Sequence, residues 1–277
     1  MGELSGARGE LVGQGVARIV LQDPAGRNAL TAPMREAVAE QLRRFYDMRE
    51  VRAIVIGAEG RNFSVGGDLG QIADHAGGQA AFQLMRSVGE LPLLLDASPK
   101  PLIAAVHGHC IGAGAGLALL CDHIVAGKTA SIGFPFLKVG VVPDFGVTYT
   151  LPRRVGPSIA RRALIGARTF ASPEALDAGL VDEVVEDDEV WERSLAYAGD
   201  LAQAPVRALH QLRLMLKEAP STLSSALQAE ALNQAICFGS DALREGIAAF
   251  KEKRSPDFVR AEAAAAGRPD EQRREPS

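Results

Sequence analysis

Short apolar runs alternate with amphipathic stretches along the first two thirds of the chain. The segments LVGQG and VARIVLQDP predict two strands around a tight turn at Gly13 to Gly15. Apolar residues then recur at helical spacing from Met34 to Phe45, after the capping residue Thr31. Residues 51–58 and 101–107 are continuous apolar runs, which are typical of buried parallel strands.

The middle of the chain repeats this rhythm with more interruptions. We expect a helix over 79–97 that Pro92 bends or interrupts, preceded by a mobile cover over 73–80 that contains an exposed His75. Two short strands are predicted over residues 122–127 and 130–134, and an irregular apolar stretch follows over 134–152. A short helix over 172–179 and an edge strand over 180–185 complete this part.

Beyond Asp187 only helical patterns remain, over residues 188–204, 206–217, 221–238 and 240–253. Their apolar stripes have no strands to cover, so we expect them to pack on the core and on neighbouring subunits. The sequence therefore predicts an α/β core over 1–204 and a helical region over 205–260. Residues 261–277 are charged and rich in small residues, which favours a frayed or disordered tail.

Composition narrows the class of protein. Hydrophobic residues make up 47% of the 277 residues, enough for a sizeable core, and the net charge of −4 argues against a nucleic-acid surface. No apolar run approaches the roughly 20 residues needed to span a bilayer, and the N-terminus has no signal region, so a cytoplasmic location without membrane contact is expected. The three cysteines lack the spacing of a disulfide framework or a zinc site, and no metal is predicted.

Two glycine-rich segments follow predicted strands. Residues 107–122, HGHCIGAGAGLALLCD, predict a strand, a turn and a helix N-terminus, whose free N–H groups bind anions or a developing negative oxygen. For the glycines alone, tight packing of the helix on the sheet is the simpler reading. Gly66 and Gly67 lie just beyond another strand, where ligands collect in α/β sheets. Asp68 after them is interpreted as a loop or cap carboxylate.

Asp144 is an unusual carboxylate because Val141, Val142, Pro143 and Phe145 surround it in sequence. Desolvation penalises its charge, so either hydrogen bonds rescue it or it is kept for chemistry. A structural aspartate that caps the turn at Gly146 is the alternative.

The histidines and cysteines add no second site. No serine or cysteine with a matched acid indicates a triad around His107, His109 or His123, and packing or a backbone hydrogen bond is favoured for each. For Cys110 a small buried residue is the simpler reading.

Several ordered motifs together carry a family resemblance from about residue 10 to residue 258. They are RNAL at 27–30, NFSVGGDL at 62–69, KPLIAAVHGHCIGAGAGLALLCD at 100–122, VGVVPDFGVTYTLPRRVG at 139–156, EALDAGLVDEVV at 174–185 and EGIAAFKEKRSPDF at 245–258. The chain resembles the enoyl-CoA hydratase/isomerase (crotonase) family. The resemblance implies a spiral of ββα units forming two sheets, with C-terminal helices that assemble trimers or dimers of trimers.

The resemblance also implies an acyl-CoA substrate, with coenzyme A as part of that substrate and no prosthetic group. By position, the thioester oxygen would be held by the N–H groups of Gly67 and Ala113. Contacts to coenzyme A are expected from Arg27, Ala29, Leu30, Ser64, Val65, Gly66, Phe250 and Lys253, the last two from the same or a neighbouring subunit.

The sequence departs from the hydratases of the family, which add water using two glutamates. By alignment those positions hold Gly116 and Phe136, neither of which exchanges a proton. Asp144 lies where the double-bond isomerases and the 1,2-epoxyphenylacetyl-CoA isomerases of the family carry their acidic residue. The sequence around Asp144 is most similar to that of the 1,2-epoxyphenylacetyl-CoA isomerases. Phe134, Phe136 and Phe145, with Gly116, would line an apolar or aromatic acyl group or simply form core.

We therefore expect an acyl-CoA isomerase in which Asp144, with a raised pKa, moves the proton. Two alternatives stay open: a hydratase or hydrolase that uses Asp144 alone to activate water, and a catalytically silent member that binds acyl-CoA.

Overall fold

The computed structural model describes residues 6–74, 77–218 and 220–266 of the chain. It forms two compact units that divide between Gly199 and Asp200. Each unit is described by itself. The predicted cover residue His75 lies outside the described residues, whereas the neighbouring parts of residues 73–80 belong to the ends of two helices.

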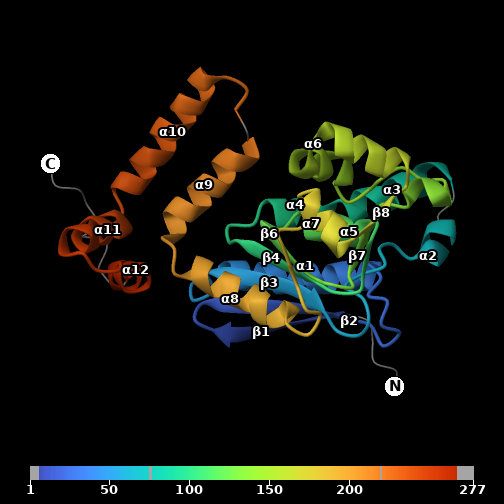
Figure 1. Cartoon of the computed structure of the whole chain (residues 1–277), viewed down its shortest axis with the longest axis horizontal. Helices are drawn as coiled ribbons and strands as arrows, with labels where there is room; N and C mark the ends of the chain where they lie inside the picture. The colour runs from blue at the N-terminus through green and yellow to red at the C-terminus, as the bar shows by residue number, and fades with distance from the viewer. Residues whose placement is uncertain (1–5, 75–76, 219, 267–277) are drawn as a thin grey trace. The chain divides into compact units, whose positions relative to one another are not determined.

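The first unit is built on two sheets (Figure 1). The larger sheet has the order β1-β2-β3-β4-β6-β9; β1 pairs with β2 antiparallel and all later pairs are parallel. Its strands are β1 (Gly6–Gly13), β2 (Val16–Gln22), β3 (Ala53–Ala58), β4 (Leu102–Val106), β6 (His123–Gly127) and β9 (Glu183–Val185). The predicted turn, the buried strands and the edge strand are thereby confirmed. The smaller sheet joins β5 (His109–Ile111), β7 (Ser131–Gly133) and β8 (Thr169–Ala171). The sequence analysis did not predict β5 and β8, because a strand of three residues is too short to show a hydrophobic period of two.

Helices cover both faces of the larger sheet. α1 (Ala32–Asp47) begins at its predicted cap, Thr31, and buries its apolar face with α4 (Glu90–Asp96) against strand residues such as Ile54 and Ile56. On the opposite face, α8 (Val190–Ala202) places Trp191 against Gly57, where a Cβ would meet the indole at 2.6 Å. The large aliphatic residues of β3 are fully buried as a result.

The helical segments between β3 and β4, and those between β7 and β8, differ from the prediction. The pattern over 79–97 divides into α3 (Gly78–Val88) and α4 at Gly89, three residues before Pro92, and a short α2 (Leu69–Asp74) precedes them. The stretch predicted as irregular over 134–152 contains the 3₁₀ turn η1 (Phe136–Val139) and the start of α6 (Val147–Ile165). The start of α6 was not predicted because its proline and threonine residues have low helix propensity. α5 (Ala113–Leu119) and α7 (Ser172–Asp177) form as predicted.

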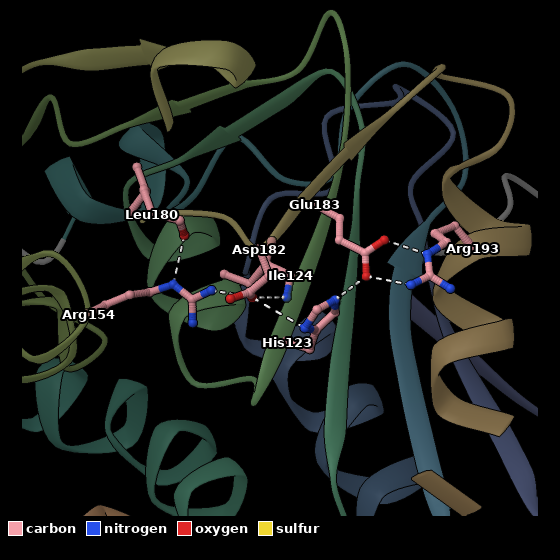
Figure 2. Close-up of polar contacts among 7 residues, drawn as sticks. All are labelled: His123, Ile124, Arg154, Leu180, Asp182, Glu183 and Arg193. Atoms are coloured by element: carbon pink, nitrogen blue, oxygen red, sulfur yellow. Dashed lines mark hydrogen bonds and ion pairs between the residues drawn. The ribbon is translucent and has the colours of Figure 1, made fainter. Parts of the chain in front are cut away.

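Figure 2 shows how polar side chains fix the edge strand β9 to the sheet. His123 Nε2 lies 2.9 Å from Glu183 Oε1, and Arg193 of α8 forms an ion pair with the same carboxylate. Arg154 of α6 binds the carboxylate of Asp182, which also accepts the Ile124 N–H at 2.7 Å. His123 stacks on Tyr197 with ring centroids 3.7 Å apart. These contacts join β6, β9, α6 and α8.

The second unit consists of the predicted helices and one more: α9 (Val206–Glu218), α10 (Leu223–Phe238), α11 (Asp241–Glu252) and α12 (Phe258–Ala266). The prediction of a disordered tail from residue 261 is wrong up to Ala266, because the alanine-rich segment 261–266 continues α12. Residues 267–277 lie outside the described residues. No described helix combines the length and apolar character needed to span a bilayer.

Candidate active site

Three loops at one edge of the larger sheet form the candidate site. They follow the carboxyl ends of the adjacent parallel strands β2, β3 and β4, the edge at which α/β sheets bind ligands. Backbone hydrogen bonds join them: Leu30 N–H donates to Gly66 O at 2.8 Å, and Ile111 N–H to Ser64 O at 2.9 Å. The glycine-rich segments and RNAL are therefore brought together, although about 80 residues of sequence separate them.

Asn28 locks the first two loops and was not singled out by the sequence analysis. It is fully buried in a left-handed conformation with φ of +48°, and its Nδ2 donates to Glu59 O at 2.9 Å and Asn62 O at 2.7 Å. Asparagine tolerates this conformation better than most residues. Its signal in the sequence was a polar residue between an arginine and two apolar residues in a loop.

The two predicted oxyanion donors lie on neighbouring loops. Gly66 has φ of +88°, and a Cβ there would meet Ile111 O at 2.6 Å and Ala113 N at 3.2 Å, so only glycine lets the loops approach this closely. Among the described residues, the N–H groups of Gly67 and Ala113 donate no hydrogen bond; Ala113 opens α5, where N–H groups have no partner within the helix. Two backbone donors thus remain available on adjacent loops.

Asp144 lies just before α6 with its carboxylate partly buried. Its Oδ1 is inaccessible to solvent and has no hydrogen-bond partner among the described residues. Burial raises the pKa of Asp144, opposed by a backbone hydrogen bond and by the positive charge of Arg35. The N-cap of α6 is Gly146, which receives no side-chain cap, so the structural alternative of a capping aspartate is not supported. An unpaired, desolvated carboxylate can take up and release a proton.

The backbone after Asp144 is strained. Phe145 adopts φ of +51°, a region that bulky residues rarely occupy, and Gly146 follows with φ of +74°. Such strain persists only where the surroundings enforce it, and it is common at active sites. Here the reversal buries the Phe145 ring, which is 3% exposed, and leads Val147 into α6.

The predicted pocket residues surround α5. A Cβ on Gly116 would meet Phe145 Cβ at 2.8 Å and Phe145 O at 3.0 Å, so Phe145 occupies the space beside this helix position. The Phe136 ring lies 3.8 Å from the Cβ position of Gly112. Phe134 is fully buried and packs edge-on against Phe170, with ring centroids 6.4 Å apart. Phe134 thus packs in the core, and lining of an acyl group stays a prediction for Phe134, Phe136 and Phe145.

Arg35 is a second residue that the sequence analysis missed. It lies on the apolar face of α1 and is only 8% exposed. Its signal was an arginine three residues before Val38 and seven before Leu42, inside the apolar stripe. Burial lowers the pKa of Arg35, opposed by the negative charges of Glu36 and Asp144, and the positive charge of Arg35 in turn lowers the pKa of Asp144.

The residues predicted to contact coenzyme A have different environments. Arg27 is exposed and Val65 half-buried, whereas Ala29 and Leu30 expose only 8% and 3% of their surface. Ser64 is fully buried and its hydroxyl accepts the Gly66 N–H, which stabilises the loop; the contact of Ser64 with coenzyme A stays a prediction.

Phe250 and Lys253 belong to the second unit. Phe250 is 85% exposed on α11, and Lys253 ends that helix in a left-handed conformation. Their contact with coenzyme A stays a prediction.

The remaining polar candidates have structural partners. Asp68 accepts the Gly70 N–H at 2.8 Å and so caps α2, as predicted. His107 Nε2 lies 3.1 Å from Gly60 O, which agrees with the expected backbone hydrogen bond, whereas His109 Nδ1 lies 2.7 Å from the side-chain Oγ of Ser131. Cys110 is fully buried, and burial raises the pKa of its thiol. Among the described residues, no group of three His, Cys, Asp or Glu side chains could hold a metal ion.

Comparison with known proteins connects this geometry to a family. The enoyl-CoA hydratase/isomerase family model matches residues 12–261. The chain is 34% identical to 2,3-dehydroadipyl-CoA hydratase of Escherichia coli strain K12, over 88% of this chain and 95% of the relative. It is 31% identical to 1,2-epoxyphenylacetyl-CoA isomerase of the same organism, over 90% and 96%.

The fold is also similar to that of a solved structure. The crystal structure of an enoyl-CoA hydratase from Polaromonas sp. JS666 superimposes with a TM-score of 0.85 and 31% identity, covering 91% of this chain and 98% of that one. The resemblance drawn from the motifs and the crotonase-like fold are thereby confirmed.

Proposed function

We propose that this chain, which belongs to the enoyl-CoA hydratase/isomerase family, is an acyl-CoA isomerase in which Asp144 is the acid and base. The N–H groups of Gly67 and Ala113 hold the thioester oxygen of the substrate. Three features support this assignment: the two unpartnered donors, the buried oxygen of Asp144 without a partner, and the raised pKa of that carboxylate.

The observation that carries the proposal is the contact between Gly116 and Phe145. The resemblance assigns to this helix position one of the two glutamates that hydratases of the family use. Here even a Cβ would approach Phe145 Cβ to 2.8 Å, so the helix and the Asp144 segment are packed without room for an acidic side chain. The second glutamate position holds Phe136, which is apolar and 7% exposed. One carboxylate is enough for a proton shift but not for the two-glutamate hydration.

The proposed reaction moves one proton within the substrate. Asp144 removes a proton from C2 of a 3-enoyl thioester, and the electron pair of that C–H bond delocalises onto the thioester oxygen as an enolate. The two backbone donors stabilise this charge by roughly 3–4 kcal/mol each, as measured for donors in other oxyanion holes. Asp144 then returns the proton at C4, which leaves the double bond between C2 and C3. Ring opening of an epoxide proceeds through a comparable enolate.

The acyl group and the assembly are further parts of the proposal. Phe136 and Phe145 favour an apolar or aromatic acyl group beside the carboxylate. The second unit carries large apolar side chains that are exposed in the single chain, and we expect subunits of a trimer or a dimer of trimers to cover them. Among them are Leu216, Leu223, Leu232, Phe238 and Phe250.

A hydratase that uses Asp144 alone to activate water is the second candidate, because the names of this chain's relatives are more often those of hydratases. Incubation of 3-enoyl-CoA and 2-enoyl-CoA thioesters in heavy water, followed by mass spectrometry, separates the two. Deuterium incorporation without gain of water supports the isomerase, whereas a hydrated product would overturn it.

Asp144→Asn should abolish exchange while coenzyme A binding, measured by calorimetry, persists. Asp188→Asn, which changes an exposed carboxylate before α8, is the matched control and should exchange at the rate of the unaltered protein. Binding of coenzyme A without turnover of any thioester by the unaltered protein would indicate a silent member and refute the proposal.

A further inference from the structure

Arg35 carries a buried positive charge beside the candidate site. Burying a guanidinium is unfavourable unless hydrogen bonds compensate it. Nη1 of Arg35 donates to Leu30 O at 2.8 Å, and Nη2 donates to Ser87 Oγ of α3 at 3.2 Å. The side chain thus ties α1 to the loop after β2 and to the helix that follows Gly77.

Within the described part of the chain, no ion pair neutralises the charge of Arg35. Among the described residues, Arg35 has no carboxylate within salt-bridge distance; the acidic groups that act on it at longer range are Glu36 of α1, Asp144 before α6 and Glu90 of α4. Burial lowers the pKa of Arg35, but an arginine stays protonated at neutral pH. The positive charge of Arg35 lowers the pKa of Asp144 against the effect of burial.

The Leu30 contact also reaches the backbone donor at Gly67. Arg35 holds the Leu30 carbonyl, and the N–H of Leu30 donates to Gly66 O at 2.8 Å. The Gly66 carbonyl and the Gly67 N–H belong to one planar peptide unit, so a bond to the oxygen fixes the direction of that N–H. It also polarises the N–H as a donor.

We propose that Arg35 is a positioning residue of this site, whose guanidinium fixes the Leu30 segment that orients the Gly66–Gly67 peptide, and whose positive charge favours the ionised carboxylate of Asp144. The inference rests on the proposed isomerase function. It assigns to one residue a link between the base and an oxyanion donor.

The test is the pH profile of kcat/KM with trans-3-hexenoyl-CoA for Arg35→Gln, Arg35→Lys and Arg44→Gln. Arg44→Gln removes the same charge from an exposed position of α1 and is the matched control. In Arg35→Gln, loss of the charge should move the acid limb to higher pH by about one unit. Loss of the two-pronged contact should lower kcat by about tenfold or more, with a smaller change in KM.

Arg35→Lys keeps the charge but not the planar fork, so its acid limb should stay in place while kcat falls. Arg44→Gln should change neither. If Arg35→Gln fails to fold, Arg35→Lys carries the test, and a wild-type kcat in that variant would overturn the inference.

Asp144→Asn, measured in parallel, separates the two hypotheses. If it is inactive and folded Arg35→Gln retains the wild-type acid limb, the role of Arg35 is refuted and the isomerase proposal stands. If Asp144→Asn keeps full activity, the isomerase proposal itself fails.

Discussion

Replacing Gly116 with alanine tests the packing on which the proposed function depends. In the interior of a helix, alanine is normally favoured over glycine by about 1 kcal/mol. In α5, however, the added Cβ would lie 2.8 Å from Phe145 Cβ, 3.0 Å from Phe145 O and 3.1 Å from Val147 Cγ2. Two of these atoms belong to Phe145, whose backbone is already strained at φ of +51°. The segment after Asp144 must therefore shift.

The magnitude follows from two opposing effects. Overpacking of a well-packed core costs about 1–3 kcal/mol, and the gain in helix propensity offsets about 1 kcal/mol of this. The free energy of unfolding should therefore fall by about 1 kcal/mol, which corresponds to a decrease in Tm of about 2–4 °C for a chain of this size. Because Phe145 directly follows the proposed base, kcat should fall more than KM rises.

Thermal unfolding at fixed protein concentration and steady-state kinetics measure these effects. Gly199→Ala is the control: it also lies inside a helix, α8, but its Cβ would meet nothing closer than Gln14 Oε1 at 3.9 Å. That variant should be more stable by up to about 1 kcal/mol. A Gly116→Ala protein that is as stable as Gly199→Ala and retains wild-type kcat would refute the tight packing of α5 against Phe145.

Three further predictions concern buried polar groups. Burial raises the pKa of Asp144, so its ionised form destabilises the folded state as pH rises; Asp144→Asn should increase Tm at pH 7, and the increase should vanish in acid. Burial lowers the pKa of Lys100 to about 8. The free energy of unfolding should therefore rise with pH from about pH 8 up to the ordinary pKa of lysine. In urea titrations, Lys100→Met should lack this rise. The same variant leaves the carbonyl of Met48, 2.5 Å from Nζ, without its donor, which should cost about 1–3 kcal/mol. His123→Phe retains an aromatic ring but loses the 2.9 Å contact with Glu183, and a loss of about 1 kcal/mol in urea denaturation is expected, whereas an unchanged midpoint would count against that contact.

Much of the fold could be read from local patterns. Thr31 and the apolar stripe that ends at Phe45 predicted α1 because capping and helical period are properties of neighbouring residues. The strands β5 and β8 were missed because three residues carry no measurable period, and their pairing depends on partners elsewhere in the chain. The start of α6 at Val147 was missed because contacts with α5 and η1 outweigh the weak helix propensity of its threonine and proline residues.

The candidate site divides in the same way. Asp144 stood out because a carboxylate among apolar neighbours is chemically unusual whatever the fold. The burial of Ser64 was not foreseen because it depends on the bridge to Cys110, which the sequence around Ser64 does not reveal. Arg35 looked like one charged residue of an amphipathic helix, and only its contact with Leu30, which lies in a loop bonded to Gly66, gives it a place at the site.

The sequence by itself determined the family, the α/β core, the helical second part and the candidate base, since motifs, caps and apolar periods are encoded in residues close together along the chain. The tertiary structure alone decided that Phe145 fills the space beside Gly116, that Gly66 brings two backbone donors onto neighbouring loops, and that Arg35 binds the Leu30 carbonyl beside the site. The physical reason is that close packing and long-range charge depend on distances between residues far apart in sequence, and these distances exist only once the chain has folded.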